Sequence, residues 1–381
     1  MGHYTRRLVR YVAVICLFFS AAIANAEELT WTHYGIRPLA MGNAFVAVAD
    51  DFNTIFYNPA GLARLKTWSG ELLNPSLAIS SNTVSAINGI KKLATPSPAG
   101  SSSTEAEDKA LEILQQNTGK TQYFNLSYTP HLVFPGFGFG LGLDAGGSLV
   151  VHRDISADVQ VGPRLIAPFS FAKNFLEDRL SLGFSVKLVA QGGVNHSFGI
   201  NDISAFTGKS ASTSGPKLKD FIEGGYGVGS DIGLLFTPIK TMQPTLGLSV
   251  TDLGGTPFKK ADVQGEALAA PSTRLPSMNA GFSLRPWESH GMYLLTTVDA
   301  HAINQPIHYS KKFNVGAEWG WGSVLKVQTG LHQGSLSGGL QLDVFLLTLR
   351  FVTYTEQVGT IAGQDPNLQD RRYALQLKLL I

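Results

Sequence analysis

Segments in which every second residue is large and apolar recur along the whole chain, with mostly Gly and Ser between them. In residues 180–188 the apolar positions are Leu, Leu, Phe, Val and Leu, separated by Ser, Gly, Ser and Lys. Residues 313–321 alternate in the same way, with Asn, Gly, Glu and Gly on the second face. Successive side chains of a β-strand point to opposite faces, so the pattern predicts strands whose two faces meet different surroundings.

The second face of these strands carries few charges, whereas the outer face of a soluble β-sandwich carries many. The chain has 41 Gly among its 381 residues, and only 15% of its residues are charged. Soluble proteins average roughly 7% Gly and 25% charged residues. This composition excludes a disordered chain and a long-helix protein. The net charge of +2 also argues against a nucleic-acid partner. We therefore expect lipid to face much of the surface.

The alternation predicts fourteen strands, which start near residues 69, 123, 138, 155, 180, 224, 244, 274, 292, 311, 324, 336, 345 and 371. Short connections alternate with longer ones, as in outer-membrane barrels. The longest expected loops are 80–122, 195–223 and 253–273. In the first of these, residues 105–117 have the apolar spacing of an amphipathic helix. The predicted fold is an all-β, transmembrane, antiparallel β-barrel of about 14 strands that spans residues 68–381.

Residues 1–26 have the features of a cleaved secretory signal peptide. Three arginines precede an apolar run of about 13 residues and the small-residue sequence Ala-Asn-Ala. The single cysteine, Cys16, lies inside this signal, so the exported chain is predicted to have no disulfide and no thiol chemistry. No later segment is apolar enough for a transmembrane helix, so strands would have to cross the membrane. The predicted location is the outer membrane of a Gram-negative cell.

Residues 27–67 precede the barrel and do not alternate as strands. They contain Leu-Ala-Met-Gly-Asn-Ala-Phe-Val-Ala-Val-Ala-Asp-Asp, followed by Phe-Tyr-Asn-Pro-Ala-Gly-Leu. Over residues 35–66 the chain resembles the N-terminal signature of the FadL-like superfamily. This superfamily includes fatty-acid and hydrocarbon channels and the PorV/PorQ-type outer-membrane proteins. The resemblance implies a fourteen-stranded barrel in which residues 27–67 form a hatch inside the lumen.

The resemblance also implies how such a hatch works. Movement of the hatch opens a hydrophobic path, and the substrate leaves sideways into the membrane through a gap in the wall. Carried onto this sequence, the hatch motif is Asn58, Pro59, Ala60 and Gly61. The apolar residues that we expect along a ligand path are Phe45, Phe52, Phe56 and Leu62, although packing against the wall is the simpler explanation for any single one of them.

A glycine stripe is expected to make room for the hatch. Gly138, Gly140 and Gly142 share one face of a predicted strand, where hatch backbone could approach the wall closely. Glycine in a strand also allows the bend that a lateral gap requires. Ease of barrel curvature is an equally good explanation for these glycines.

No catalytic, metal-binding or cofactor-binding motif is recognisable, so the chain is predicted not to be an enzyme. His301 and Asp299 share one face of a predicted strand. They are expected to form a polar pair in the lumen, with a metal-binding edge as the less favoured alternative. The remaining ionisable residues expected on the lumen side are Lys187, Asp231, Glu318, Lys326 and Lys378. Charges belong on this side because the lipid side disfavours them.

Three functional hypotheses follow. The first is passive uptake of hydrophobic small molecules, such as long-chain fatty acids or hydrocarbons, with membrane lipid and the solute as partners. The second is a PorV-type role, in which the barrel binds a protein of a secretion system and does not conduct. The third is a structural barrel without a transport role.

Overall fold

The computed structural model describes residues 35–85, 87, 117–152, 156–199, 218–263, 266–358 and 369–379. The predicted signal peptide lies outside the described residues, as does all of the helix predicted at 105–117 except its last residue. No helix within the described ranges is long and apolar enough to cross a membrane.

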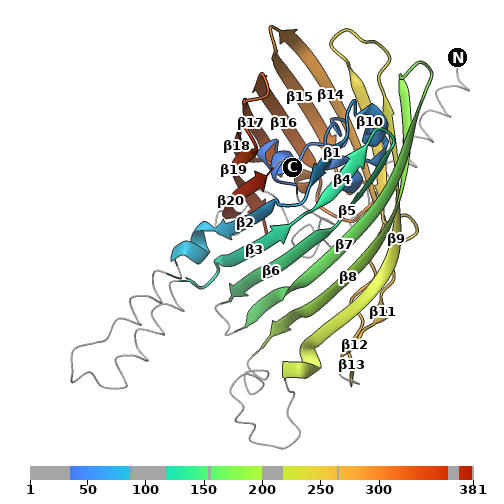
Figure 1. Cartoon of the computed structure of the whole chain (residues 1–381). Coiled ribbons are helices and arrows are strands. Elements are labelled where there is room, and N and C mark those ends of the chain that lie inside the picture. The colour runs from blue at the N-terminus through green and yellow to red at the C-terminus, as the bar shows by residue number, and fades with distance from the viewer. Residues whose placement is uncertain are drawn as a thin grey trace, which may run out of the picture.

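Within these ranges, fourteen strands form a closed antiparallel ring (Figure 1). The ring closes because the last strand pairs with the first, as shown by the partnership of Ser76 with Gln376. In ring order the strands are β2 (Pro75–Ser80), β3 (Thr121–Tyr128), β6 (Gly142–Val151), β7 (Ala157–Phe175), β8 (Leu180–Phe198), β9 (Ile222–Phe236), β10 (Thr245–Thr251), β14 (Ser277–Ser289), β15 (Met292–Ala300), β16 (Phe313–Trp321), β17 (Leu325–His332), β18 (Ser335–Val344), β19 (Leu347–Gln357) and β20 (Gln369–Leu379). The predicted barrel is confirmed.

Shorter strands complete the sheet at one place in the wall. There β1 (Ser69–Glu71) pairs with β4 (His131–Phe134), β4 pairs with β5 (Phe137–Gly140), and β5 pairs with β7. The remaining short strands belong to the connection between β10 and β14: β11 (Lys259–Lys260), β12 (Asp262–Val263) and β13 (Glu266–Ala267).

The predicted strands differ from the observed ones mainly at their ends. The first predicted strand is divided into β1 and β2. The strand predicted from 345 begins at Leu347, because Phe345 has a positive φ of 58° in the preceding turn. The loop predicted at 195–223 is shorter than expected, because β8 continues to Phe198 and β9 begins at Ile222.

The two faces of each strand differ in burial, as the alternation predicts. On β8 the outward-facing Phe184 and Leu188 are 44% and 50% exposed, whereas Ser185 and Lys187 point inward and are buried. The outer surface carries large apolar side chains on every long strand. A water-soluble monomer rarely exposes so much contiguous apolar surface. The lipid-facing pattern expected from the sequence is therefore present.

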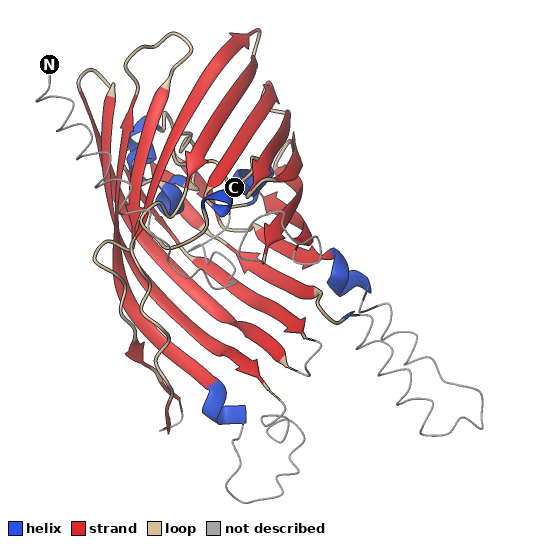
Figure 2. Ribbon diagram, turned by 180° about the vertical axis from the view of Figure 1, so that it is seen from behind, coloured by secondary structure: helices blue, strands red, loops and turns tan. Residues whose placement is uncertain are grey.

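Residues 35–66, hereafter the inner segment, lie inside the ring (Figures 1 and 2). The segment contains α2 (Ile36–Ala40), α3 (Thr54–Tyr57) and the 3-10 helix η1 (Pro59–Arg64). α2 contacts β17, β18 and β19, while η1 contacts β7, β8 and β9 on the other side of the ring. The segment therefore spans the lumen. Two further 3-10 helices, η3 (Leu218–Phe221) and η4 (Tyr309–Lys311), lie in loops.

Candidate functional site

Inward-facing glycines let the backbone of the inner segment touch the wall. A Cβ at Gly233 would lie 2.0 Å from the side-chain oxygen of Asn58, and one at Gly316 would lie 2.4 Å from the carbonyl oxygen of Met41. Both separations are shorter than real side chains allow. The glycines that meet the backbone or Asn58 in this way are Gly183, Gly233, Gly247, Gly316 and Gly330.

The glycine stripe predicted to admit hatch backbone behaves differently. Cβ atoms at Gly138 and Gly140 would meet the side chains of Leu62 and Ile55, at 2.9 and 2.7 Å. The expectation that backbone approaches the wall at this stripe is therefore wrong. The close backbone contacts occur at glycines on other strands, because α2 and η1 lie against those strands.

Asn58 joins the inner segment to two barrel strands. It is fully buried, and its side-chain oxygen accepts a hydrogen bond from the Ala60 N–H and so caps η1. Its Nδ2 donates to the carbonyl oxygen of Val46 at 2.8 Å and approaches those of Leu234 and Leu248 at 3.2 and 3.4 Å. Asparagine suits this position because a single amide supplies both the cap and the donors. Asn58 and Pro59 thus start the 3-10 helix η1.

The remaining motif residues pack where no larger side chain would fit. A Cβ at Gly61 would lie 2.1 Å from the Ala49 carbonyl oxygen. Ala60 is buried together with Ala49 and Leu235. The motif Asn58, Pro59, Ala60 and Gly61 is therefore a compact contact between the inner segment and the wall.

Asp299 of β15 anchors the inner segment through its backbone. One carboxylate oxygen accepts hydrogen bonds from the N–H groups of Phe45 and Val46, at 2.6 and 2.7 Å. The same oxygen lies 3.3 Å from Nε2 of His301. The structure thus brings His301 and Asp299 together in the lumen, as expected. Asp299 has the additional role of binding two buried N–H groups, which would be costly to leave unpaired.

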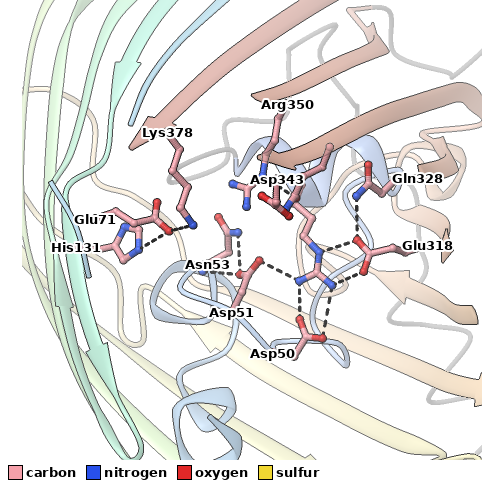
Figure 3. A network of polar contacts seen from close by, with 12 residues as sticks. Asp50, Asp51, Asn53, Glu71, His131, Glu318, Gln328, Asp343, Arg350 and Lys378 are labelled. Carbon is pink, nitrogen blue, oxygen red and sulfur yellow. Dashed lines mark hydrogen bonds and ion pairs between the residues drawn. The ribbon is translucent and has the colours of Figure 1, made fainter. Parts of the chain in front are cut away.

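Arg37 lies at the centre of an ionic network (Figure 3). Its guanidinium donates two hydrogen bonds of 2.7 Å to the two carboxylate oxygens of Glu318 on β16. The same group contacts Asp50 at 2.6 Å and Asp51 at 2.9 Å. Gln328 of β17 completes the network by donating to Glu318 at 3.0 Å. A bidentate pair of this kind fixes orientation as well as charge.

Burial and charge act in opposite directions on Asp51. Burial alone would raise the pKa of its carboxyl group, but the neighbouring Arg37 guanidinium holds that pKa below its ordinary value. Asn53 assists by donating both its backbone and its side-chain N–H to the same Asp51 oxygen, each at 2.8 Å. Asp51 is therefore a stable anion that keeps Arg37 in place.

The four apolar residues predicted along a ligand path share one apolar cluster. Phe45, Phe52, Phe56 and Leu62 are all buried. The wall contributes the buried side chains Val133 of β4, Ile166 of β7 and Val189 of β8. Their role in a ligand path stays a prediction.

The barrel wall is interrupted next to this apolar cluster. The pairing of β5 with β7 ends at Phe139 and Phe169, and the pairing of β6 with β7 begins only at Gly142 and Ile166. Pro168 lies in the gap and has no N–H to donate, so a ladder hydrogen bond is missing there.

The interruption continues across the neighbouring strands. Residues 72–74 between β1 and β2 lie opposite only two residues, 129–130, so the wall contains a β-bulge. The Asn74 side chain fills the break. Its oxygen accepts the Thr129 N–H at 2.9 Å, and its Nδ2 donates to the Thr129 carbonyl.

Phe52 of the inner segment covers the interruption from inside. Its ring stacks on His131 with centroids 3.8 Å apart and an interplanar angle of 8°. His131 Nε2 lies 3.4 Å from Glu71, and Lys378 pairs with the same carboxylate (Figure 3). Lys378 thus points into the lumen, as predicted.

The other predicted lumen charges also face inward. Lys187 contacts Asp231 at 2.7 Å and Asp252 at 3.0 Å. Sequence reasoning placed Glu318 in the lumen but missed its partner Arg37. A lone Arg in an otherwise apolar segment, thirteen residues before two adjacent Asp, is the signal that could have found it.

The residues that the structure describes contain no group of three His, Cys, Asp or Glu side chains placed to hold a metal ion. A groove of about 410 Å³ lies on the outer surface, lined largely by outward-facing residues of β14 to β18 such as Phe282, Val315 and Leu331. None of the inner-segment residues lines this groove.

No model of a known protein family matches the sequence, and no curated protein matches it. Several solved structures share its fold. The CymD monoaromatic hydrocarbon channel is 13% identical, with a TM-score of 0.52 over 93% of this chain and 99% of that chain. The Ralstonia pickettii toluene transporter TbuX is 14% identical, with a TM-score of 0.51 over 92% and 100%. A deltaS2S3 mutant of the TodX monoaromatic hydrocarbon channel is 12% identical, with a TM-score of 0.53 over 91% and 99%. At these identities the similarity shows a common fold.

Proposed function

We propose that this chain is an outer-membrane channel for the passive uptake of hydrophobic small molecules, with the inner segment as its hatch. The observation that carries the proposal is the position of the apolar cluster directly behind the interrupted wall. Phe52 lies against His131 at the bulge, and Val133 and Ile166 belong to the same cluster. An apolar solute that enters this cluster would lie next to a weak point that faces lipid.

The surface supports a membrane location. Large apolar side chains face outward, and Trp68, Trp287, Trp319 and Trp321 all lie towards the short-turn end of the barrel. Tryptophan is favoured at membrane interfaces, where an apolar ring meets a wet edge. The proposed location is the outer membrane, reached through cleavage of the signal peptide predicted at residues 1–26.

The fold of the hydrocarbon channels supports the solute class. Proteins of this fold include the monoaromatic hydrocarbon channel CymD and the toluene transporter TbuX. Here the proposed driving force for binding is burial of apolar area, at about 25 cal/mol per Å². The proposed channel needs no cofactor and catalyses no reaction.

Uptake of labelled solutes tests this proposal. The chain is expressed in cells that lack their own fatty-acid channel, and entry of a long-chain fatty acid and of toluene is measured. Faster entry of at least one solute than in cells with an empty vector is the expected result. No entry of any of several apolar solutes, with the barrel correctly inserted, would reject the proposal. Co-purification of a secretion-system protein in that case would favour the PorV-type role.

A further inference from the structure

The groove of about 410 Å³ on the outer surface has no part in the proposed uptake path. A volume of this size is in the range of ligand sites. Its lining comes from β14, β15, β16, β17 and β18, none of which belongs to the interrupted wall. The groove therefore needs an explanation of its own.

A row of small outward-facing residues makes this part of the wall hollow. Thr296 of β15 lies opposite Ala317 of β16, and Ala317 lies opposite Thr329 of β17. Gly338 of β18 extends the row beside Thr329. The rows on either side carry larger side chains, namely Val298, Val315, Leu331 and Leu336 on one side and Trp319 and Leu340 on the other.

The groove offers little to a polar ligand. The Thr296 hydroxyl donates to the Leu284 carbonyl oxygen at 3.3 Å. The Thr329 hydroxyl donates to the Ser337 carbonyl oxygen at the same distance. Both hydroxyl protons are therefore used within the wall, and the rest of the lining is mostly apolar. Such a groove suits an acyl chain, which is held by packing rather than by hydrogen bonds.

A cation lies at the edge of this groove. Arg371 shares the outward face of β20 with the exposed Tyr373. Its Nη1 donates to the carbonyl oxygen of Leu336, a lining residue, at 2.6 Å and to the Thr355 hydroxyl at 3.2 Å. Both acceptors are neutral. Among the residues that the structure describes, only Nη1 of this guanidinium has acceptors, so Nε and Nη2 can donate to a further oxygen-rich group.

A second cation directly precedes one of the strands that line the groove. Lys312 lies immediately before β16, and its Nζ donates to the carbonyl oxygens of Ile303 and Gln305, at 3.1 and 2.8 Å. These acceptors are neutral as well. Neither contact of Lys312 and neither contact of Arg371 thus compensates a positive charge.

Both cations lie at the same end of the barrel. β16 runs from Phe313, next to Lys312, to Trp321, and β20 runs in the same direction because four antiparallel pairings separate the two strands. Arg371 is the third residue of β20 and therefore lies at the Lys312 end. That end carries the connection of residues 301–312, and longer connections are extracellular in outer-membrane barrels. The two charges are thus placed at the outer leaflet.

We infer that this face of the barrel binds a phosphorylated glycolipid of the outer leaflet, of the lipid A type. One acyl chain occupies the groove, and the phosphate groups bind Arg371 and Lys312. The planar guanidinium suits a phosphate because its donors match the phosphate oxygens in pairs. This assignment rests on the proposed outer-membrane location and is independent of solute uptake.

Native mass spectrometry of the purified barrel measures this binding directly. The barrel is titrated with lipid A, with dephosphorylated lipid A, with phosphatidylglycerol and with phosphatidylcholine. The fraction of barrels that carry a lipid gives an apparent affinity for each. We expect lipid A to bind most tightly, because it combines the phosphates with the acyl chains.

Two substitutions separate the contribution of the phosphate from that of the chain. Arg371→Gln should weaken lipid A binding about fivefold, the typical effect of one basic residue near a charged membrane surface. It should leave the binding of dephosphorylated lipid A unchanged. Ala317→Leu fills the groove and should weaken the binding of both forms several-fold.

Matched controls test whether these effects are local. Arg285→Gln removes a cation near the opposite end of β14, and Ala280→Leu enlarges a small outward-facing residue that does not line the groove. Both should leave the affinity for lipid A unchanged. Heat-modifiable gel mobility, which reports barrel formation, is measured for every variant.

Equal affinity for lipid A in the unsubstituted chain, Arg371→Gln and Ala317→Leu would overturn the inference. Phosphatidylglycerol that binds as tightly as lipid A would overturn the choice of the outer-leaflet glycolipid. A dimer that is lost in Ala317→Leu would instead make the groove a contact between two copies of the chain. Lipid A binding without solute uptake would reject only the proposed function, and uptake without binding would reject only the lipid site.

Discussion

The guanidinium of Arg37 binds both carboxylate oxygens of Glu318 at 2.7 Å, although 281 residues separate the two in sequence. Arg37 belongs to the inner segment and Glu318 to β16, so this pair joins the segment to the wall. Both side chains are almost completely buried. Removing one partner of such a pair leaves an uncompensated buried charge, at a cost of about 3 to 5 kcal/mol.

Arg37→Leu should therefore loosen the inner segment more than it weakens the barrel. Glu318, Asp50 and Asp51 would all lose their common cation. To measure this, a single cysteine is placed in the buried part of the inner segment by Val48→Cys. We expect its thiol to react faster with a maleimide in the Arg37→Leu variant. The heat-modifiable gel mobility, which reports barrel formation, should stay unchanged. Arg285→Leu is the control, because Arg285 pairs with an exposed Glu288 at 3.3 Å, and exposed pairs contribute less than about 1 kcal/mol. Equal labelling in the two variants would contradict the anchoring role of Arg37.

Gly233→Ala tests the close contact at the Asn58 motif. The new Cβ would lie 2.0 Å from the Asn58 side chain and 2.9 Å from the Pro59 ring. Overpacking of this kind costs about 1 to 3 kcal/mol. In this variant the Val48→Cys thiol of the inner segment should become accessible to labelling at a lower temperature than in the unsubstituted chain. Gly338→Ala is the matched control, because its Cβ would meet only one atom, at 3.6 Å. The prediction fails if both substitutions shift that temperature equally.

Acid should release the inner segment through Asp51. The pKa of Asp51 is lowered in the folded chain, chiefly because Arg37 opposes the effect of burial. A carboxyl group whose pKa is lowered by folding stabilises the folded chain fully at pH values above its ordinary pKa, which is about 3.9 for aspartate. This stabilisation is lost as the pH falls through the lowered pKa. The labelling rate of the buried Val48→Cys thiol is divided by that of a thiol at an exposed position, Ser272→Cys, which corrects for the pH dependence of the reaction itself. This ratio should rise below about pH 4. Asp51→Asn should weaken this acid step, and an unchanged step would exclude Asp51 as its source.

The strands could be predicted from sequence because barrel alternation is a local signal. Each strand separates lipid from a packed lumen, so the period of two persists along its whole length. The β-bulge in the wall could not be predicted from sequence in the same way. Residues 72–74 become a bulge only because their partners at 129–130 are one residue shorter, and that relation depends on pairing.

The contacts of the inner segment could be predicted only in part. Asn58 and Pro59 carry a local helix-start signal, and the structure shows the cap. The partners of Arg37 and the second role of Asp299 depend on which strands face the segment across the lumen, which no local pattern encodes. The glycine stripe at Gly138 was assigned the wrong contact for the same reason.

Uptake through a Phe52→Ala variant tests whether apolar solutes pass the inner segment at the interrupted wall. Phe52 stacks on His131 inside the wall, whereas Phe313 is 54% exposed on the outer surface and serves as the matched control. Initial uptake rates of a labelled apolar solute are compared at equal amounts of inserted barrel. We predict that Phe52→Ala changes the rate several-fold, while Phe313→Ala leaves it unchanged. Identical rates for Phe52→Ala, Phe313→Ala and the unsubstituted chain would contradict passage of the solute at this site.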